Sequence, residues 1–172
     1  MLTKIDLCSM ALLKLGEPPI QSFQDDTVAA KLGRTLTDFV LDSLLALHPW
    51  HFACRTIELV KNQNGDIEIP LDVLRIIKTD GEVQGNKIIC GSNKTTILAI
   101  VRVSPEMFPS YFSSLVATRL AMEFCIPITS DQTVFRMLAS LYETELQSAK
   151  FLDSTMSKNC GIESFSLISS RF

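Results

Sequence analysis

The sequence lacks most of the residue patterns that carry chemistry. It contains two histidines and seven glycines, and no glycine-rich loop of the kind that cradles phosphate. The five cysteines are dispersed and odd in number, without a Cys-x-x-Cys pair, which indicates reduced thiols in an intracellular product and not a disulfide framework. Lysines and arginines form no run and the net charge is -3, so the basic stripe of a protein that grips nucleic-acid backbones is missing.

Long apolar runs are also missing. None approaches the ~18 residues that a membrane span requires, and Asp6 interrupts the N-terminus within an amphipathic pattern that argues against a secretory signal. Yet 47% of the residues are hydrophobic and the mean hydropathy is +0.24, which is high for a soluble monomer. We therefore expect no membrane contact and assign the surplus apolar surface to contacts between subunits.

The two histidines supply the one arrangement with ligand-like spacing. His48, His51 and Cys54 form His-x2-His-x2-Cys, but an intervening proline and a change from helix to strand direct the side chains apart, and a fourth ligand is missing. A Ser/His/acid triad needs one of the same histidines, and Ser114 and Ser140 lie in mid-helix, where a nucleophile is poorly presented. We predict no metal, no cofactor and no enzymatic activity. A small cytosolic hydrolase using His51 is the alternative from another functional class.

Two kinds of periodicity divide the chain into two pairs of helices and an inserted β region. Apolar residues recur at helical spacing over residues 3–15, 26–48, 105–125 and 131–156. Between the second and third helices the period changes to two, which predicts a small antiparallel sheet over residues 55–103. Its last strand, around residues 97–101, is apolar on both faces and is predicted to be central. The predicted fold class is α+β, a four-helix bundle with a β insertion in a single domain over residues 1–157.

Capping residues and prolines set several of these boundaries. Asp25 or Asp26 is predicted to cap the second helix, and Ser130 or Asp131 the fourth. Pro127 is predicted to break the third helix, because proline removes a backbone donor and clashes with the preceding turn.

The second helix has more apolar surface than one packed face can bury. Most of its apolar side chains fall on one broad arc of a helical projection, comprising Val28, Ala29, Leu32, Leu36, Phe39, Val40, Leu44 and Leu47. We predict that this arc is the main packing face. Leu41 and Leu45 project away from it, need a second partner, and are therefore candidate subunit-interface residues.

Three charged residues lie within the apolar stripes of the third and fourth helices. Arg119 and Glu123 share a face with Phe112, and Glu145 lies among leucines of the fourth helix. A charge in an apolar stripe is costly unless it is paired. We predict that Arg119 forms a structural ion pair with Glu123 or Glu145, with a catalytic role as the alternative.

Residues 158–172 are predicted to form a C-terminal arm. Phe165, Leu167 and Ile168 are interspersed with serines, a pattern suited to adding a strand at the edge of a neighbouring subunit's sheet. We include these three residues among the candidate subunit-interface residues. A disordered end is the alternative.

The order of short motifs along the chain resembles that of a known family. The segment 13–20 reads LKLGEPPI and closes the first helix, and Trp50-His51-Phe52 closes the second. Further motifs follow in order, namely Arg102-Val103, Met107-Phe108-Pro109, Arg119-Leu120-Ala121, Pro127-Ile128-Thr129, Tyr142-Glu143 and Ala149-Lys150. The series resembles the tail tubular protein A family of short-tailed bacteriophages, the adaptors between portal and tail, over about residues 5–157.

This resemblance implies a structural virion protein of the neck or tail that is made in the host bacterial cytoplasm. It implies a ring homo-oligomer, dodecameric to match the portal, which binds the portal protein and a downstream tail or nozzle protein. Genome DNA would pass through without specific binding, which suits an acidic chain without a basic stripe. A ring needs two different contact faces on each subunit. A head-completion or tail-terminator ring protein is the alternative within the same logic.

Overall fold

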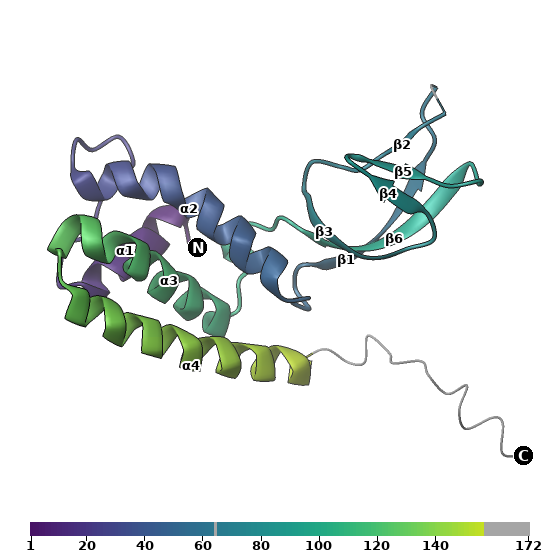
Figure 1. Ribbon diagram of the computed structural model, residues 1–172. Helices are drawn as coiled ribbons and strands as arrows, with labels where there is room; N and C mark the ends of the chain where they lie inside the picture. Colours follow the sequence, from purple (N-terminus) through teal and green to yellow (C-terminus); the bar gives the residue numbers. More distant parts are fainter. Residues whose placement is uncertain (64, 157–172) are drawn as a thin grey trace, which may run out of the picture.

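In the computed structural model, residues 1–63 and 65–156 are described, and over these residues the chain forms four α-helices and six β-strands. The predicted α+β class is confirmed, with the strands inserted between the second and third helices (Figure 1). The helices are α1 (Lys4–Lys14), α2 (Val28–Leu47), α3 (Ser110–Thr129) and α4 (Gln132–Met156).

Helix α3 is the centre of the helical bundle. It packs against α1, α2 and α4, and α2 and α4 lie on opposite sides of it (Figure 1). The side chains of Leu120 and Phe124 are fully buried, as the nearly all-round apolar pattern of this helix requires. By length and composition α3 is apolar enough to cross a membrane, but most of it is buried inside the protein, as is usual for a core helix.

The β region consists of two small antiparallel sheets, where one sheet was predicted. The first has the order β1-β6-β3, from β1 (Cys54–Val60), β6 (Lys94–Val101) and β3 (Val73–Thr79). The second has the order β2-β5-β4, from β2 (Ile67–Glu68), β5 (Lys87–Ile89) and β4 (Glu82–Gln84). The predicted central position of the last strand is confirmed, because β6 pairs on both sides. Ile67, Ile88 and Ile97 are among the residues that form a separate small core for this region.

An aromatic corner joins the helical bundle to the β region. Trp50 follows the end of α2, is fully buried, and donates its indole N–H to the Leu44 carbonyl at 2.8 Å. Phe52 and Phe112 pack against each other and around the Trp50 ring, with ring centroids 4.9 to 6.2 Å apart. Such aromatic contacts add to the apolar burial itself. These contacts therefore fix the end of α2, the start of β1 and the first turn of α3 in position relative to one another.

The N-cap predicted for α2 is wrong, and the one predicted for α4 is confirmed. Thr27 caps α2, because its Oγ1 accepts a hydrogen bond from the Ala30 N–H at 3.1 Å. Asp25 instead accepts from the N–H of Ser22 in the preceding loop. At α4, Asp131 Oδ1 accepts from the N–H groups of Thr133 and Val134, so Asp131 and not Ser130 is the cap.

Pro127 does not break the third helix, contrary to the prediction. A 3-10 turn over Pro105–Met107 precedes α3, which starts at Ser110 and continues through Pro127 to Thr129. The proline lies in the last turn, so little helix remains beyond the backbone hydrogen bond that it removes. Ser130 ends the helix in the left-handed conformation, with φ at 54° and its N–H bonded to the Ile126 carbonyl.

The face of α2 that packs on the bundle coincides only in part with the predicted arc, of which Val40 and Leu44 are buried and Leu32 and Leu36 pack against the core at partial exposure. Leu41 and Leu45 are buried in the chain's own core, whereas Val28, Phe39 and Leu47 on the predicted arc are exposed. The identification of Leu41 and Leu45 as interface residues is therefore wrong.

The buried face of α2 differs from the predicted arc because α1 and α2 approach each other closely. A Cβ placed on Gly33 would lie 3.0 Å from the Phe23 ring and 3.3 Å from Cys8 Sγ. One turn further on, Thr37 Oγ1 lies 3.0 Å from the same sulfur. Gly33 and Thr37 permit this close approach only on their own side of α2, and that side becomes the buried face. Leu41 and Leu45 lie on the same face.

Because Leu45 is buried and Phe39 is exposed, truncating these two side chains should change the free energy of unfolding by very different amounts. Leu45 is 0% exposed, so Leu45→Ala should lower the free energy of unfolding by about 2–5 kcal/mol through lost burial and a residual cavity. Phe39 is 68% exposed, so Phe39→Ala should change it by less than ~0.5 kcal/mol in the monomer. Urea denaturation of the dilute protein measures both. A Phe39→Ala protein that loses as much stability as Leu45→Ala would restore the predicted arc as the core face.

Candidate functional site

Arg119 forms the predicted ion pair with Glu123. Its Nη2 lies 2.6 Å from Glu123 Oε1, one helical turn further along α3, and its guanidinium lies over the Tyr142 ring. Both charged side chains are about one-third exposed, at 33% and 32%, so the pair is only partly desolvated. A pair with this exposure contributes about 0–1 kcal/mol to stability.

Glu145, the other predicted candidate, does not pair with Arg119. The Ser114 hydroxyl donates to its Oε1 at 2.9 Å, and Thr118 Oγ1 lies 2.5 Å from its Oε2. Lys14 Nζ lies 3.6 Å from the carboxylate and donates to Thr118 at 2.8 Å. The contacts join α1, α3 and α4, and they engage Ser114, one of the two candidate nucleophiles.

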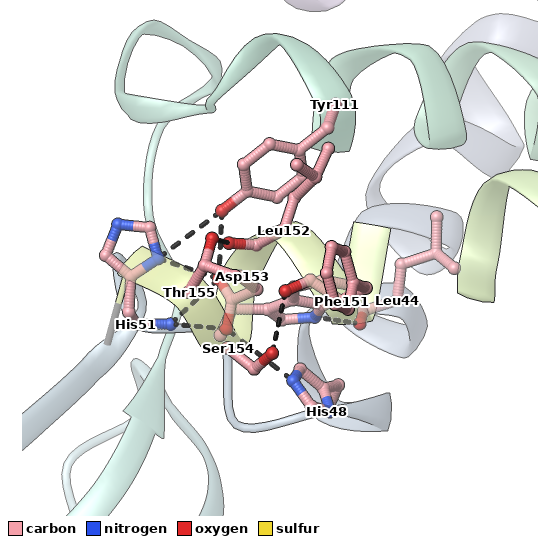
Figure 2. A network of polar contacts seen from close by, with 10 residues as sticks. Leu44, His48, His51, Tyr111, Phe151, Leu152, Asp153, Ser154 and Thr155 are labelled. Atoms are coloured by element: carbon pink, nitrogen blue, oxygen red, sulfur yellow. Dashed lines mark hydrogen bonds and ion pairs between the residues drawn. The ribbon is translucent and has the colours of Figure 1, made fainter. Parts of the chain in front are cut away.

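A buried carboxylate, Asp153, joins α4 to the corner that follows α2 (Figure 2). Its side chain is 2% exposed. Oδ1 lies 2.7 Å from His51 Nδ1, and both carboxylate oxygens accept from the His51 backbone N–H at 3.2 Å. The Tyr111 hydroxyl donates to Oδ1 at 2.9 Å, and His48 Nε2 lies 3.5 Å from Oδ2. We refer to Asp153, His51, His48 and Tyr111 as the Asp153 cluster.

The two histidines converge, although the sequence was expected to direct them apart. Both turn toward Asp153, which lies about a hundred residues further along the chain and was not anticipated. Asp153 is a lone acid on the buried stripe of α4, beyond Leu146 and Ala149. The same rule that singled out Glu145, a charge inside an apolar stripe, would have found it.

Burial sets the protonation behaviour of this cluster. It lowers the pKa of His48 below the ordinary value of 6.5, and Asp153 opposes this by attraction. Burial also raises the pKa of Tyr111, helped by its hydrogen bond to Asp153, so the hydroxyl stays protonated and remains a donor. Within residues 1–63 and 65–156, no group of three or more His, Cys, Asp or Glu side chains is placed to hold a metal.

Helices α2 and α4 each carry a second apolar face that the bundle leaves wholly or partly exposed. The α2 stripe runs along α2 and contains only uncharged side chains, of which Leu32 and Leu36 are half-buried against the core and the others are exposed or half-exposed: Val28, Leu32, Leu36, Phe39, Ser43, Ala46 and Leu47. The α4 stripe is likewise uncharged, and all its members are exposed: Met137, Leu141, Thr144, Ser148, Phe151, Leu152 and Thr155. Charged residues lie on the flanks, such as Asp38 on α2 and Glu143 on α4.

The two stripes belong to different helices, α2 and α4, which lie on either side of α3 (Figure 1). At its first residue, Val28, the α2 stripe borders a groove of about 390 Å³ that is also lined by Pro18, Pro19 and Pro127. Residues 165, 167 and 168 of the predicted arm lie outside the described residues.

No protein-family model matches this chain, and no curated protein matches it. The case for a function therefore rests on the geometry of the two stripes and the Asp153 cluster.

The buried position of His48 predicts a pH dependence of stability. Because the folded-state pKa lies below 6.5, the folded protein binds fewer protons than the unfolded chain as His48 titrates. The contribution to the free energy of unfolding is full above pH 6.5, and it declines as the pH falls through 6.5 toward the folded-state pKa. Urea denaturation between about pH 5 and about pH 8 measures this decline.

A non-titrating variant provides the control for this prediction. His48→Gln removes the titration while keeping a polar side chain, so its stability profile should be flatter below pH 6.5 than that of the unmodified protein. Equal slopes for the two proteins would contradict the assignment to His48.

Proposed function

We propose that the protein is a structural subunit of a ring, the head-to-tail adaptor between a bacteriophage portal and its tail, through which the genome passes. The observation that carries this proposal is the presence of two uncharged, largely exposed apolar stripes on two different helices, α2 and α4, which flank α3. The order of motifs that resembles the tail tubular protein A family supports it. So does the helix–helix–sheet–helix–helix plan of the fold.

A ring forms when one face of a subunit binds a different face of the next. Such a heterologous contact closes into a ring if the rotation between neighbours permits, whereas a single self-complementary face stops at a dimer. The α2 stripe and the α4 stripe are distinct surfaces on distinct sides of α3. We infer that the α2 stripe of one copy packs on the α4 stripe of the next.

The dimensions and composition of the stripes suit this pairing. Helices of 20 and 25 residues are roughly 30 and 37 Å long at 1.5 Å per residue, so the two stripes have comparable length. Exposed Phe39, Met137 and Phe151 are large side chains of the kinds enriched at interfaces. A second copy covers both stripes without leaving a buried charge unpaired, because neither stripe contains one.

The overall charge agrees with a conduit for DNA. A net charge of -3 without a basic run disfavours tight binding to phosphates, and a channel through which a genome moves must not bind it tightly. The proposed partners are therefore further copies of this chain, the portal protein and a downstream tail or nozzle protein, with DNA as passing cargo.

Mass measurement of the full chain, alone and with portal protein, tests the proposed function. An adaptor forms one closed species of defined copy number and co-purifies with the portal ring. A head-completion or tail-terminator protein would form the ring and leave the portal unbound. A chain that stays monomeric at all concentrations, with and without portal, would contradict the ring.

Mixing two interface variants tests whether neighbours associate through different faces. Phe39→Glu disables the α2 stripe and Met137→Glu the α4 stripe, and each should weaken association by about 100-fold or more by placing an unpaired carboxylate in an apolar contact. Each variant alone should remain monomeric. Mixed, they should form a heterodimer and nothing larger, because one intact α2 stripe meets one intact α4 stripe.

The control for this experiment is Gln147→Glu, which adds a carboxylate to the exposed flank of α4 and should assemble as the unmodified protein does. Self-association of either Phe39→Glu or Met137→Glu would show that one stripe binds its own copy, and would rule out the pairing of α2 with α4.

A further inference from the structure

The last two turns of α4 have one buried anchor. From Lys150 to Met156, Asp153 is the one buried residue, and Phe151, Leu152 and Met156 are exposed. Earlier in the helix, Leu138, Leu146 and Ala149 pack on the bundle at regular spacing. The anchoring of the helix end therefore changes from apolar packing to a single carboxylate.

The residues around this anchor add little helical stability of their own. Ser154 Oγ donates to the Phe151 carbonyl at 2.7 Å, and Thr155 Oγ1 donates to the Leu152 carbonyl at 2.7 Å. Serine and threonine have lower helix propensity than alanine or leucine, and such back-bonding slightly destabilises a helix. The contacts to Asp153 therefore anchor these turns to the rest of the protein.

Those contacts come from two elements distant in the sequence (Figure 2). His51, from the corner after α2, contributes both its backbone N–H and its ring, and Tyr111 contributes its hydroxyl from the first turn of α3. Hydrogen bonds to a charged acceptor are stronger than neutral ones, and a buried carboxylate that loses its donors is strongly destabilising. We refer to this set of contacts as the latch, which is closed when the donors surround the carboxylate, as in this structure, and would be open if the helix end detached.

The same turns carry the end of the α4 stripe. Phe151 and Leu152 lie in line with Met137 and Leu141 only while α4 remains helical up to Asp153. If the latch opens, the apolar part of the stripe ends with Leu141 and the interface loses its largest side chain.

We propose that Asp153 is a positioning residue that latches the end of α4 to the α2–β1 corner, and that the closed latch completes the α4 stripe and thereby controls subunit assembly. The assembly part rests on the proposed ring function. The latch itself is a property of the single chain.

Amide hydrogen exchange of the full-length chain in dilute solution tests the latch. Asp153→Asn removes the charge at the anchor, and exchange over residues 150–156 should become about tenfold faster while residues 134–146 are unchanged. Glu143→Gln, which neutralises an exposed carboxylate on the same helix, should leave both segments unchanged. Tyr111→Phe keeps the carboxylate and removes one donor, so it should give a smaller increase in the exchange rate over residues 150–156. If Asp153→Asn does not fold, the Tyr111→Phe comparison tests the latch in its place.

Mass measurement of the same variants tests the link to assembly. Asp153→Asn should weaken self-association relative to Glu143→Gln by about tenfold or more. Unchanged exchange over residues 150–156 would overturn the latch. Faster exchange with undiminished assembly would overturn its control of assembly. An unmodified chain that never assembles counts against the ring function, and the exchange comparison still decides whether the latch exists.

Discussion

The enclosure of α3 is the constraint on which the rest of the structure depends. This helix is apolar nearly all the way round, so α1, α2 and α4 must each contribute one face to cover it. Its two longest neighbours consequently lie on opposite sides of it. Each of them carries more apolar surface than α3 can cover, and the remainder forms the α2 and α4 stripes. Two different outward faces are what the proposed head-to-tail contact needs, so the way the core is closed also supplies the surfaces for the proposed association.

The junction between bundle and β region depends on a different kind of interaction. Trp50 and its aromatic neighbours fill the corner, and the Asp153 cluster ties α4 to the same corner through charge-assisted hydrogen bonds. On the other side of the junction, the Arg102 guanidinium forms a bidentate ion pair with the Asp42 carboxylate of α2. The apolar corner supplies burial, whereas the polar contacts fix which surfaces meet. Since the Asp153 cluster also holds the end of the α4 stripe, the junction and the proposed interface are physically linked.

Much of the fold was predictable from local signals, whereas the orientation of helices was not. Apolar periodicity and its changes located the four helices and the inserted strands, because these signals act within a few residues, whereas single caps and prolines misplaced the start of α2 and the end of α3. The buried face of α2 was predicted correctly only in part, because apolar residues on two sides of a helix do not indicate which side packs on the core. Gly33 decides that question through a contact with Phe23 and Cys8, which no periodicity reveals. The partners of Asp153 and of Glu145 were missed for a related reason, since their contacts join distant segments, although the position of Asp153 in an apolar stripe was itself a local signal. Arg119 and Glu123 were found because they lie one turn apart.

Oxidative footprinting of the assembled protein against the monomer tests the central claim most directly. Side chains on the two stripes, Phe39 on α2 with Met137 and Phe151 on α4, are exposed in the single chain, as is Leu71 between β2 and β3, which belongs to neither stripe. The pairing of α2 with α4 predicts that assembly protects Phe39, Met137 and Phe151 together and in equal proportion, while Leu71 stays reactive. Protection of only one helix, or of neither, would contradict the account.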